Sequence, residues 1–211
     1  MYKRQEVPSG QKSKLVLPDG TMVWLNGGST LKYPNNFSDK KRNVVLDGEG
    51  YFEVTSRNGV PFTVSTSAYD IIVKGTKFNV CAYDIDATSL TSLIEGKIEI
   101  DYKDELYEVS PGEGVCINKN KGTVESFRSD VDDSNAWIDG RIEYEKITLA
   151  DFAAKLSRKY GVEVCIENNE IKCHTFRISL KNNETLVQVL DGLQLIIPFE
   201  YTIDKDRIII K

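Results

Sequence analysis

The feature that most constrains the fold of this 211-residue chain is a series of short β-prone segments between Lys14 and Arg128, each ended by turn residues. Leu17-Pro-Asp-Gly20 places a tight turn between two of them, because proline presets φ and glycine tolerates a positive φ. The segment from Lys97 to Tyr102 alternates apolar and polar residues, which is typical of a strand with one solvent-exposed face. Such segments at intervals of roughly 8–12 residues, with no helical period between them, predict an all-β domain over residues 14–128, either an antiparallel sandwich or a solenoid-like fold.

The pattern changes after residue 128. Residues 129–142 are polar and predict a connector that runs into a short helix, with Trp137 and Ile138 as its anchor. Thr148 has the position of an N-cap, and Gly161 that of a helix stop. Between them, one face of the predicted helix carries Leu149, Phe152, Ala153, Leu156 and Tyr160. The strands and the second helix that follow give the order β-α-β and then β-α-β-β. Residues 143–211 therefore predict a small α+β domain with a βαβ repeat, its two helices on one face of a single sheet.

The composition argues against several classes of function. A net charge of −5 without a basic cluster does not suit a nucleic-acid partner. The four cysteines have no CxxC spacing, so we expect no metal site. Cys165 and Cys173 are the pair to expect if a disulfide forms. The single histidine, His174, neighbours Cys173, but adjacent residues of a strand point to opposite faces and cannot act as a nucleophilic pair. We expect no enzyme active site, no cofactor and no small-molecule substrate.

One peptide bond carries a chemical hypothesis. The hydroxyl of Thr76 follows the carbonyl carbon of Gly75 in the chain. In a strained turn with a polarised carbonyl, this hydroxyl can attack and move the acyl group from nitrogen to oxygen, giving an ester that hydrolyses more readily. Glycine at position 75 would permit the unusual backbone angles that this step needs. The alternative is an ordinary Gly-Thr turn or bulge between strands over residues 71–74 and 78–82.

The ends of the chain carry no membrane signal. The longest late apolar run, Leu193 to Phe199, is far shorter than the roughly 20 residues of a membrane-spanning helix. The first residues lack the apolar core of a signal peptide. We expect residues 1–13 to be a juxtamembrane linker.

Ordered matches over about 100 residues resemble the periplasmic domain of the FecR family of bacterial anti-sigma regulators. The segments that carry the resemblance are Leu17 to Asn26 with Ser29 and Leu31, Tyr33-Pro34, Phe37 and Arg42, Val45 to Val54, Pro61 to Val64, Val73 to Val80 with Tyr83, Glu95 to Ile98, and Pro111 to Glu113. Residues 143–211 are similar to the C-terminal domain of FecR-like proteins of Bacteroidota, which is akin to the short N-terminal domain of secretins and TonB-dependent receptors.

The resemblance implies a role in signal relay. It implies a periplasmic location, tethered to the inner membrane in the full-length protein. It also implies a partner, the N-terminal signalling domain of a TonB-dependent transporter, and control of an extracytoplasmic-function sigma factor through a cytoplasmic segment outside this chain. Some family members cleave themselves at the corresponding Gly-Thr bond, which here is Gly75-Thr76.

Two further expectations concern surfaces. The terminal strand, formed by Arg207, Ile208, Ile209 and Ile210, is a candidate sheet edge for the partner, with a paired or covered strand as the alternative. A carbohydrate- or surface-binding β module is the competing class of function, because Trp24 and ten tyrosines could offer stacking platforms. A buried position for Trp24 inside its apolar segment is the alternative to such a platform.

Overall fold

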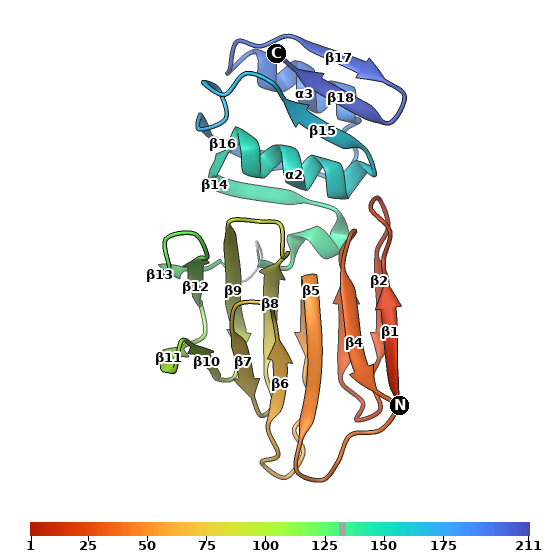
Figure 1. Ribbon diagram of the computed structural model, residues 1–211, viewed down its shortest axis with the longest axis vertical. Helices are drawn as coiled ribbons and strands as arrows, with labels where there is room; N and C mark the ends of the chain where they lie inside the picture. Colours follow the sequence, from red (N-terminus) through yellow and green to blue (C-terminus); the bar gives the residue numbers. More distant parts are fainter. Residues whose placement is uncertain (131–133) are drawn as a thin grey trace.

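The computed structural model describes residues 1–130 and 134–211, in two domains stacked along the long axis of the molecule (Figure 1). The first domain contains only strands within the described residues. In chain order these are β1 (Tyr2–Glu6), β2 (Ser13–Val16), β3 (Met22–Leu25), β4 (Thr30–Pro34), β5 (Arg42–Glu53), β6 (Phe62–Ser65), β7 (Asp70–Val73), β8 (Lys77–Ala82), β9 (Thr88–Glu95), β10 (Ile98–Tyr102), β11 (Glu105–Val109), β12 (Glu113–Asn118) and β13 (Thr123–Arg128).

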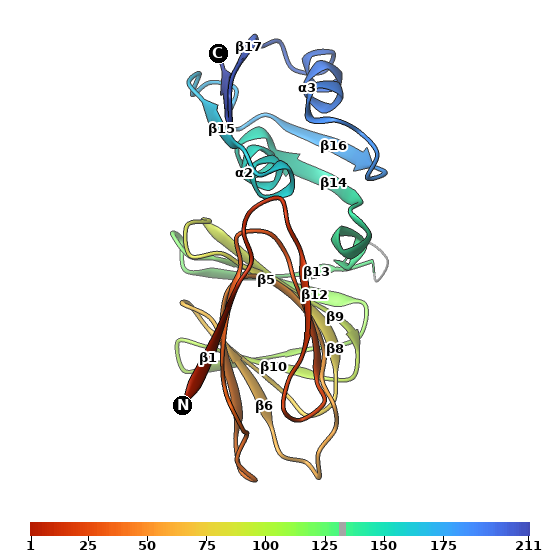
Figure 2. The same cartoon turned by 90° about the vertical axis from the view of Figure 1, so that its right-hand side faces the viewer.

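Strand β5 is long enough to belong to two layers. Its first half pairs with β4 and β6, and its second half pairs with β3 and β8. One layer continues from β4 to β1 and from β6 through β7 and β10 to β11. The other continues from β3 to β2 and from β8 through β9 and β12 to β13. The result is one large curled sheet whose two layers face each other across the core (Figure 2). The predicted all-β domain is confirmed, although the pairing of β5 with β6 is parallel.

Gly48 lies where β5 passes from one layer to the other. Asp47 still pairs with Thr30 of β4, whereas Gly48 pairs with Ala82 of β8. Its φ of 128° is one that glycine adopts readily, and a Cβ at this position would lie 2.3 Å from Oγ of Ser29. Both the backbone angle and the close contact therefore require glycine at the crossover.

A buried ion pair lies in the first domain beneath the turn that the sequence predicted. The side chains of Arg42 and Asp19 are both 0% exposed, with 2.9 Å between Nη1 and Oδ2. Arg42 also donates to the carbonyl oxygens of Thr55 and Val60 at 2.6 Å each. Asp19 accepts from the backbone nitrogen of Thr21 at 3.0 Å. One arginine thus ties the β2–β3 turn to β5 and to the loop after it.

The second domain has the predicted order of elements, which confirms the α+β class. After the 3-10 helix η1 (Ala136–Asp139) it contains β14 (Ile142–Thr148), α2 (Leu149–Tyr160), β15 (Glu163–Ile166), β16 (Thr175–Leu180), α3 (Leu186–Gln194), β17 (Tyr201–Asp204) and β18 (Arg207–Ile210). Thr148 caps α2 by accepting from the backbone nitrogen of Asp151 at 3.1 Å, and Gly161 ends it with φ of 71°. Thr185 caps α3 with a complete capping box.

Two expectations are corrected. The second domain has two small sheets, β14-β16 and β15-β18-β17, where one was expected. A local pattern locates a strand but not its neighbour, which is decided by packing between distant segments. Residues 1–13 are also not a linker throughout, because β1 pairs with β4 over the whole of Tyr2–Glu6. Part of the predicted connector, residues 131–133, lies outside the described residues.

Candidate functional site at the domain boundary

Arg158, in the last turn of α2, is buried against the first domain. Its guanidinium nitrogens bond both carboxylate oxygens of Asp86, in the β8–β9 loop. The guanidinium carbon lies 3.6 Å from the ring centroid of Tyr83, a cation–π contact. Burial works against the charge of Arg158, but the hydrogen bond and charge of Asp86 outweigh this and raise its pKa. The side chain is thus held as a cation between an acid and an aromatic ring.

The backbone completes this contact. The nitrogen of Gly10, in the β1–β2 loop, donates to the carbonyl oxygen of Arg158 at 2.7 Å. A Cβ at Gly27 would lie 2.6 Å from the same oxygen, so glycine permits the close approach of the β3–β4 loop. Figure 2 shows the β1–β2 loop reaching α2. Three loops of the first domain therefore support one end of α2.

The connector is fixed to both domains. Nε1 of Trp137 donates to Oδ1 of Asn79 on β8 at 2.9 Å. Lys12 donates to the carbonyl oxygen of Ile138 at 3.2 Å, and Lys159 of α2 donates to that of Gly140. These bonds hold η1 between the β1–β2 loop and α2.

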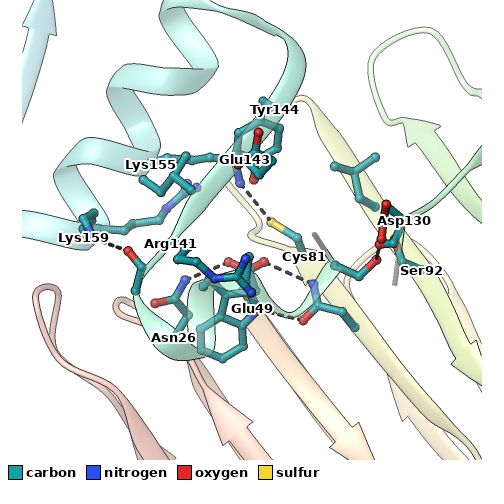
Figure 3. A pocket seen from close by; sticks show the side chains of 18 of the residues that line it. Asn26, Glu49, Cys81, Ser92, Asp130, Arg141, Glu143, Tyr144, Lys155 and Lys159 are labelled. Atoms are coloured by element: carbon teal, nitrogen blue, oxygen red, sulfur yellow. Dashed lines mark hydrogen bonds between the residues drawn. The ribbon is translucent and has the colours of Figure 1, made fainter. Parts of the chain in front are cut away.

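A cleft of about 630 Å³ lies between the domains (Figure 3). Its floor is the buried Glu49 of β5, whose carboxylate accepts from Asn26 at 2.8 Å and from Asn79 at 3.2 Å. The cleft is lined by seven basic residues and four acidic ones, although the whole chain has a net charge of −5. The basic residues are Lys12, Arg128, Arg141, Lys146, Lys155, Arg158 and Lys159. The acidic residues are Glu49, Asp130, Glu143 and Glu145.

Burial controls protonation in this cleft. It raises the pKa of the Cys81 thiol to about 12 and that of the Tyr144 phenol to about 12. Both groups are therefore neutral at physiological pH. Desolvation lowers the pKa of Lys12 and of Lys159, and the charge of Lys159 lowers that of Lys12 further. Burial also lowers the pKa of Lys155, but its interactions with Cys81, Tyr144 and Glu49 outweigh this and raise that pKa well above its usual value.

The terminal strand does not form the expected free edge. β18 pairs in parallel with β15 and antiparallel with β17, so it is the central strand of its sheet. Ile208 and Ile210 are buried, whereas Arg207 is exposed. The last strand in sequence is central because the chain returns from α3 through β17 before it ends. The outer strands of this sheet are β15 and β17.

The Gly75-Thr76 bond lies in the turn between β7 and β8. Thr76 is buried, and its hydroxyl donates to the carbonyl oxygen of Lys97 at 3.1 Å. Gly75 does not have a positive φ, so the unusual backbone angle expected there is not present. A Cβ at this position would lie 2.9 Å from Cβ of Ser56, and close packing therefore explains the glycine.

The remaining candidate residues are placed as follows. Lys14 lies over the ring of Trp24 at 4.4 Å from its centroid, and the ring of Tyr51 lies 5.3 Å away, so other side chains already contact this indole. All four cysteines are free, including Cys165 and Cys173. Among the described residues, no three His, Cys, Asp or Glu side chains are grouped as metal ligands, and no helix is long and apolar enough to cross a membrane.

Sequence reasoning missed the boundary residues. Arg158 lies outside the apolar stripe predicted for α2, and Asp86 lies in a polar loop, where acids are common. The one local signal was Trp137, an aromatic residue in a polar connector, which the sequence indicated as an anchor.

Comparisons with known proteins agree with this architecture. A model of the FecR protein family matches residues 3–99, and a model of the FecR C-terminal domain matches residues 141–210. A crystal structure at 1.65 Å of a candidate anti-sigma factor from Parabacteroides distasonis ATCC 8503 is 30% identical, covers 99% of this chain and 98% of its own, and superposes with a TM-score of 0.94.

A second structure of a candidate anti-sigma factor from the same organism, at 2.50 Å, is 28% identical and covers 100% of this chain and 98% of its own, with a TM-score of 0.94. No curated protein matches the chain. With both domains matched by family models and a relative of this identity aligned over nearly its full length, the chain belongs to the FecR family of anti-sigma factors.

Proposed function

We propose that this chain is the periplasmic signal-relay part of a transmembrane anti-sigma factor. In this role it is tethered to the inner membrane, senses a TonB-dependent outer-membrane transporter, and controls an extracytoplasmic-function sigma factor through a cytoplasmic segment. Membership of the FecR family supports the proposal. The observation that carries it is an unpaired strand edge beside exposed apolar side chains in the second domain.

The edge belongs to β17. Glu200 and Lys211 exchange both backbone hydrogen bonds, so in the antiparallel pair of β17 and β18 the bonded positions alternate, with Thr202 opposite Ile209 as the next bonded pair. The backbone N–H and C=O groups of Ile203 therefore point away from β18. An added strand could pair with these groups.

Apolar side chains lie on and near this edge. Ile203 is directly opposite the buried Ile208 and shares its face of the sheet, yet it is 50% exposed. Leu195 and Ile196, which follow α3, are 89% and 60% exposed. A partner strand on β17 would extend the sheet and cover the side chain of Ile203. The N-terminal signalling domain of the transporter is the partner that we propose.

A binding measurement tests both parts of the proposal. The signalling domain of the transporter encoded beside the gene is titrated into this chain in a calorimeter. Ile203→Lys should weaken binding by about tenfold or more, because a charge on the edge would have to be desolvated. Leu106→Lys, on the exposed β11 edge of the first domain, is the control and should bind normally.

The possible results separate the two parts. An absence of binding by the wild-type chain at ~100 μM partner, where weak transient complexes are still measurable, would contradict the relay function. Normal binding by Ile203→Lys would contradict only the choice of the β17 edge.

A further inference from the structure

Two partly buried cations of the cleft, Arg141 and Lys155, form no ion pair among the described residues. Arg141 is partly buried, and its guanidinium has no hydrogen bond or ion pair within residues 1–130 and 134–211. The ammonium of Lys155 has as its nearest partners the thiol of Cys81, 3.9 Å away, and the ring of Tyr144, 5.0 Å to the centroid. The thiol and the phenol are neutral. The acid whose charge acts on Lys155 is Glu49, which already accepts two hydrogen bonds from amide side chains. Figure 3 shows both cations around the same cleft.

Three acids of the cleft, Glu49, Glu143 and Glu145, already have hydrogen-bond or ion-pair partners. Glu49 accepts hydrogen bonds from two amide side chains. Glu143 accepts from the hydroxyl of Ser179 at 2.6 Å, and Glu145 pairs with Arg177 at 2.8 Å, both on β16. The partners of Glu143 and Glu145 are therefore side chains of β16, and not Arg141 or Lys155. Because neither Arg141 nor Lys155 forms an ion pair, an incoming oxyanion could accept charge-assisted hydrogen bonds from both.

Part of the remaining lining is apolar. Trp137, Tyr144, Leu90 and Phe127 contribute to the walls. Small-molecule sites are commonly clefts of about 300–1,000 Å³ at domain boundaries, largely apolar with a few polar groups that orient the ligand. We propose that this cleft binds an organic carboxylate with an apolar body, its carboxylate at Arg141 and Lys155 and its body against Trp137 and Tyr144.

This proposal does not depend on the transporter as partner. Such a ligand would touch α2 and the connector as well as β8 and β9, and would add contacts across the domain boundary. Its binding would therefore stabilise the arrangement of the two domains in proportion to its occupancy.

The chain provides its own optical probe. It contains two tryptophans, Trp24 and Trp137, so Trp24→Phe leaves the cleft residue as the only indole. In this background hexanoate is titrated while the fluorescence of Trp137 and the melting temperature are recorded. We expect a saturable change in fluorescence and a rise in melting temperature. Hexanol, which lacks the charge, and acetate, which lacks the apolar body, should each bind about tenfold more weakly or worse.

Variants locate the site. Arg141→Gln should weaken hexanoate binding by about tenfold or more, as expected for the loss of a charge-assisted hydrogen bond. Arg4→Gln, at an exposed arginine of β1, is the matched control and should leave binding unchanged. A lack of saturation by hexanoate, equal binding of hexanol, or full binding by a folded Arg141→Gln chain would each overturn the proposal.

Discussion

Arg158 of α2 and Asp86 of the β8–β9 loop form a two-contact ion pair that joins the two domains across 72 residues of sequence. Their side chains are 10% and 21% exposed, so solvent screens this pair much less than the pairs on the surface. The planar guanidinium also stacks on Tyr83, which a lysine could not do. The relative position of the domains therefore depends strongly on one arginine.

We predict that Arg158→Lys lowers the free energy of unfolding by about 1–3 kcal/mol, because lysine keeps the charge but loses the second contact and the stacking. Thermal unfolding should then separate into two transitions, one for each domain. Arg177→Lys, in an exposed pair with Glu145, should change stability by less than about 1 kcal/mol. A single transition at the wild-type temperature would show that this contact does not couple the domains.

A second prediction concerns the buried pair of Arg42 and Asp19. Arg42→Met leaves the Asp19 carboxylate buried without its counter-charge and should cost about 3–5 kcal/mol, measured by urea unfolding. Adding Asp19→Asn removes the stranded charge while keeping an acceptor for Thr21, so the double variant should be more stable than Arg42→Met alone. Arg57→Met, at a surface pair, serves as the control. A double variant that is less stable than the single one would contradict this account.

Stability should fall in alkali. Burial raises the pKa of Cys81, and burial followed by the charge of Glu53 raises that of Tyr51, each to about 12. The unfolded chain loses these protons at lower pH, near 8.5 for cysteine and about 10 for tyrosine, so it binds fewer protons than the folded chain in between. The stabilisation is complete below about pH 8 and is lost as the pH rises towards 12.

Urea unfolding at a series of pH values checks this dependence. Cys81→Ala should reduce the slope between about pH 9 and 11, because one of the buried acids is then missing. Cys173→Ala, at an exposed cysteine, should leave the slope as it is. A constant free energy of unfolding over this range would refute the prediction.

Self-cleavage at Gly75-Thr76 stays a prediction. It would give two fragments, residues 1–75 and 76–211, which intact-mass measurement after denaturation resolves. Thr76→Val keeps the shape of the side chain without the nucleophilic hydroxyl and should yield only the full-length mass. Ser65→Val, in β6, removes a hydroxyl elsewhere in the same domain and should be processed as the wild type is. If the wild-type chain itself shows a single full-length mass after incubation, the bond is stable.

The sequence predicted what local chemistry determines. Turn residues such as Asp19 and Gly20 marked the ends of strands, and the N-cap at Thr148 and the glycine at 161 marked the ends of a helix. These features depend on neighbours within a few residues. The family resemblance also follows from such features, and the structure shows that Arg42 and Asp19, both within the resemblance, meet in the core.

The sequence could not predict what depends on distant pairing. The parallel neighbours β15 and β18 are separated in sequence by β16, α3 and β17, so nothing local marked β18 as a central strand. The same holds for the cleft, whose residues come from both domains and the connector. The burial of Arg158 could not be predicted, because an arginine on a helix is usually exposed to solvent.

The two layers of the first domain share one continuous strand, with Gly48 as the point of transfer. Neither layer can therefore peel away while the other stays intact, since losing β5 would expose the interior on both sides. We expect this half of the molecule to resist a pull as a single mechanical unit. A pull applied to its ends would then be transmitted through it, which is what the membrane-tethered relay that we propose would require.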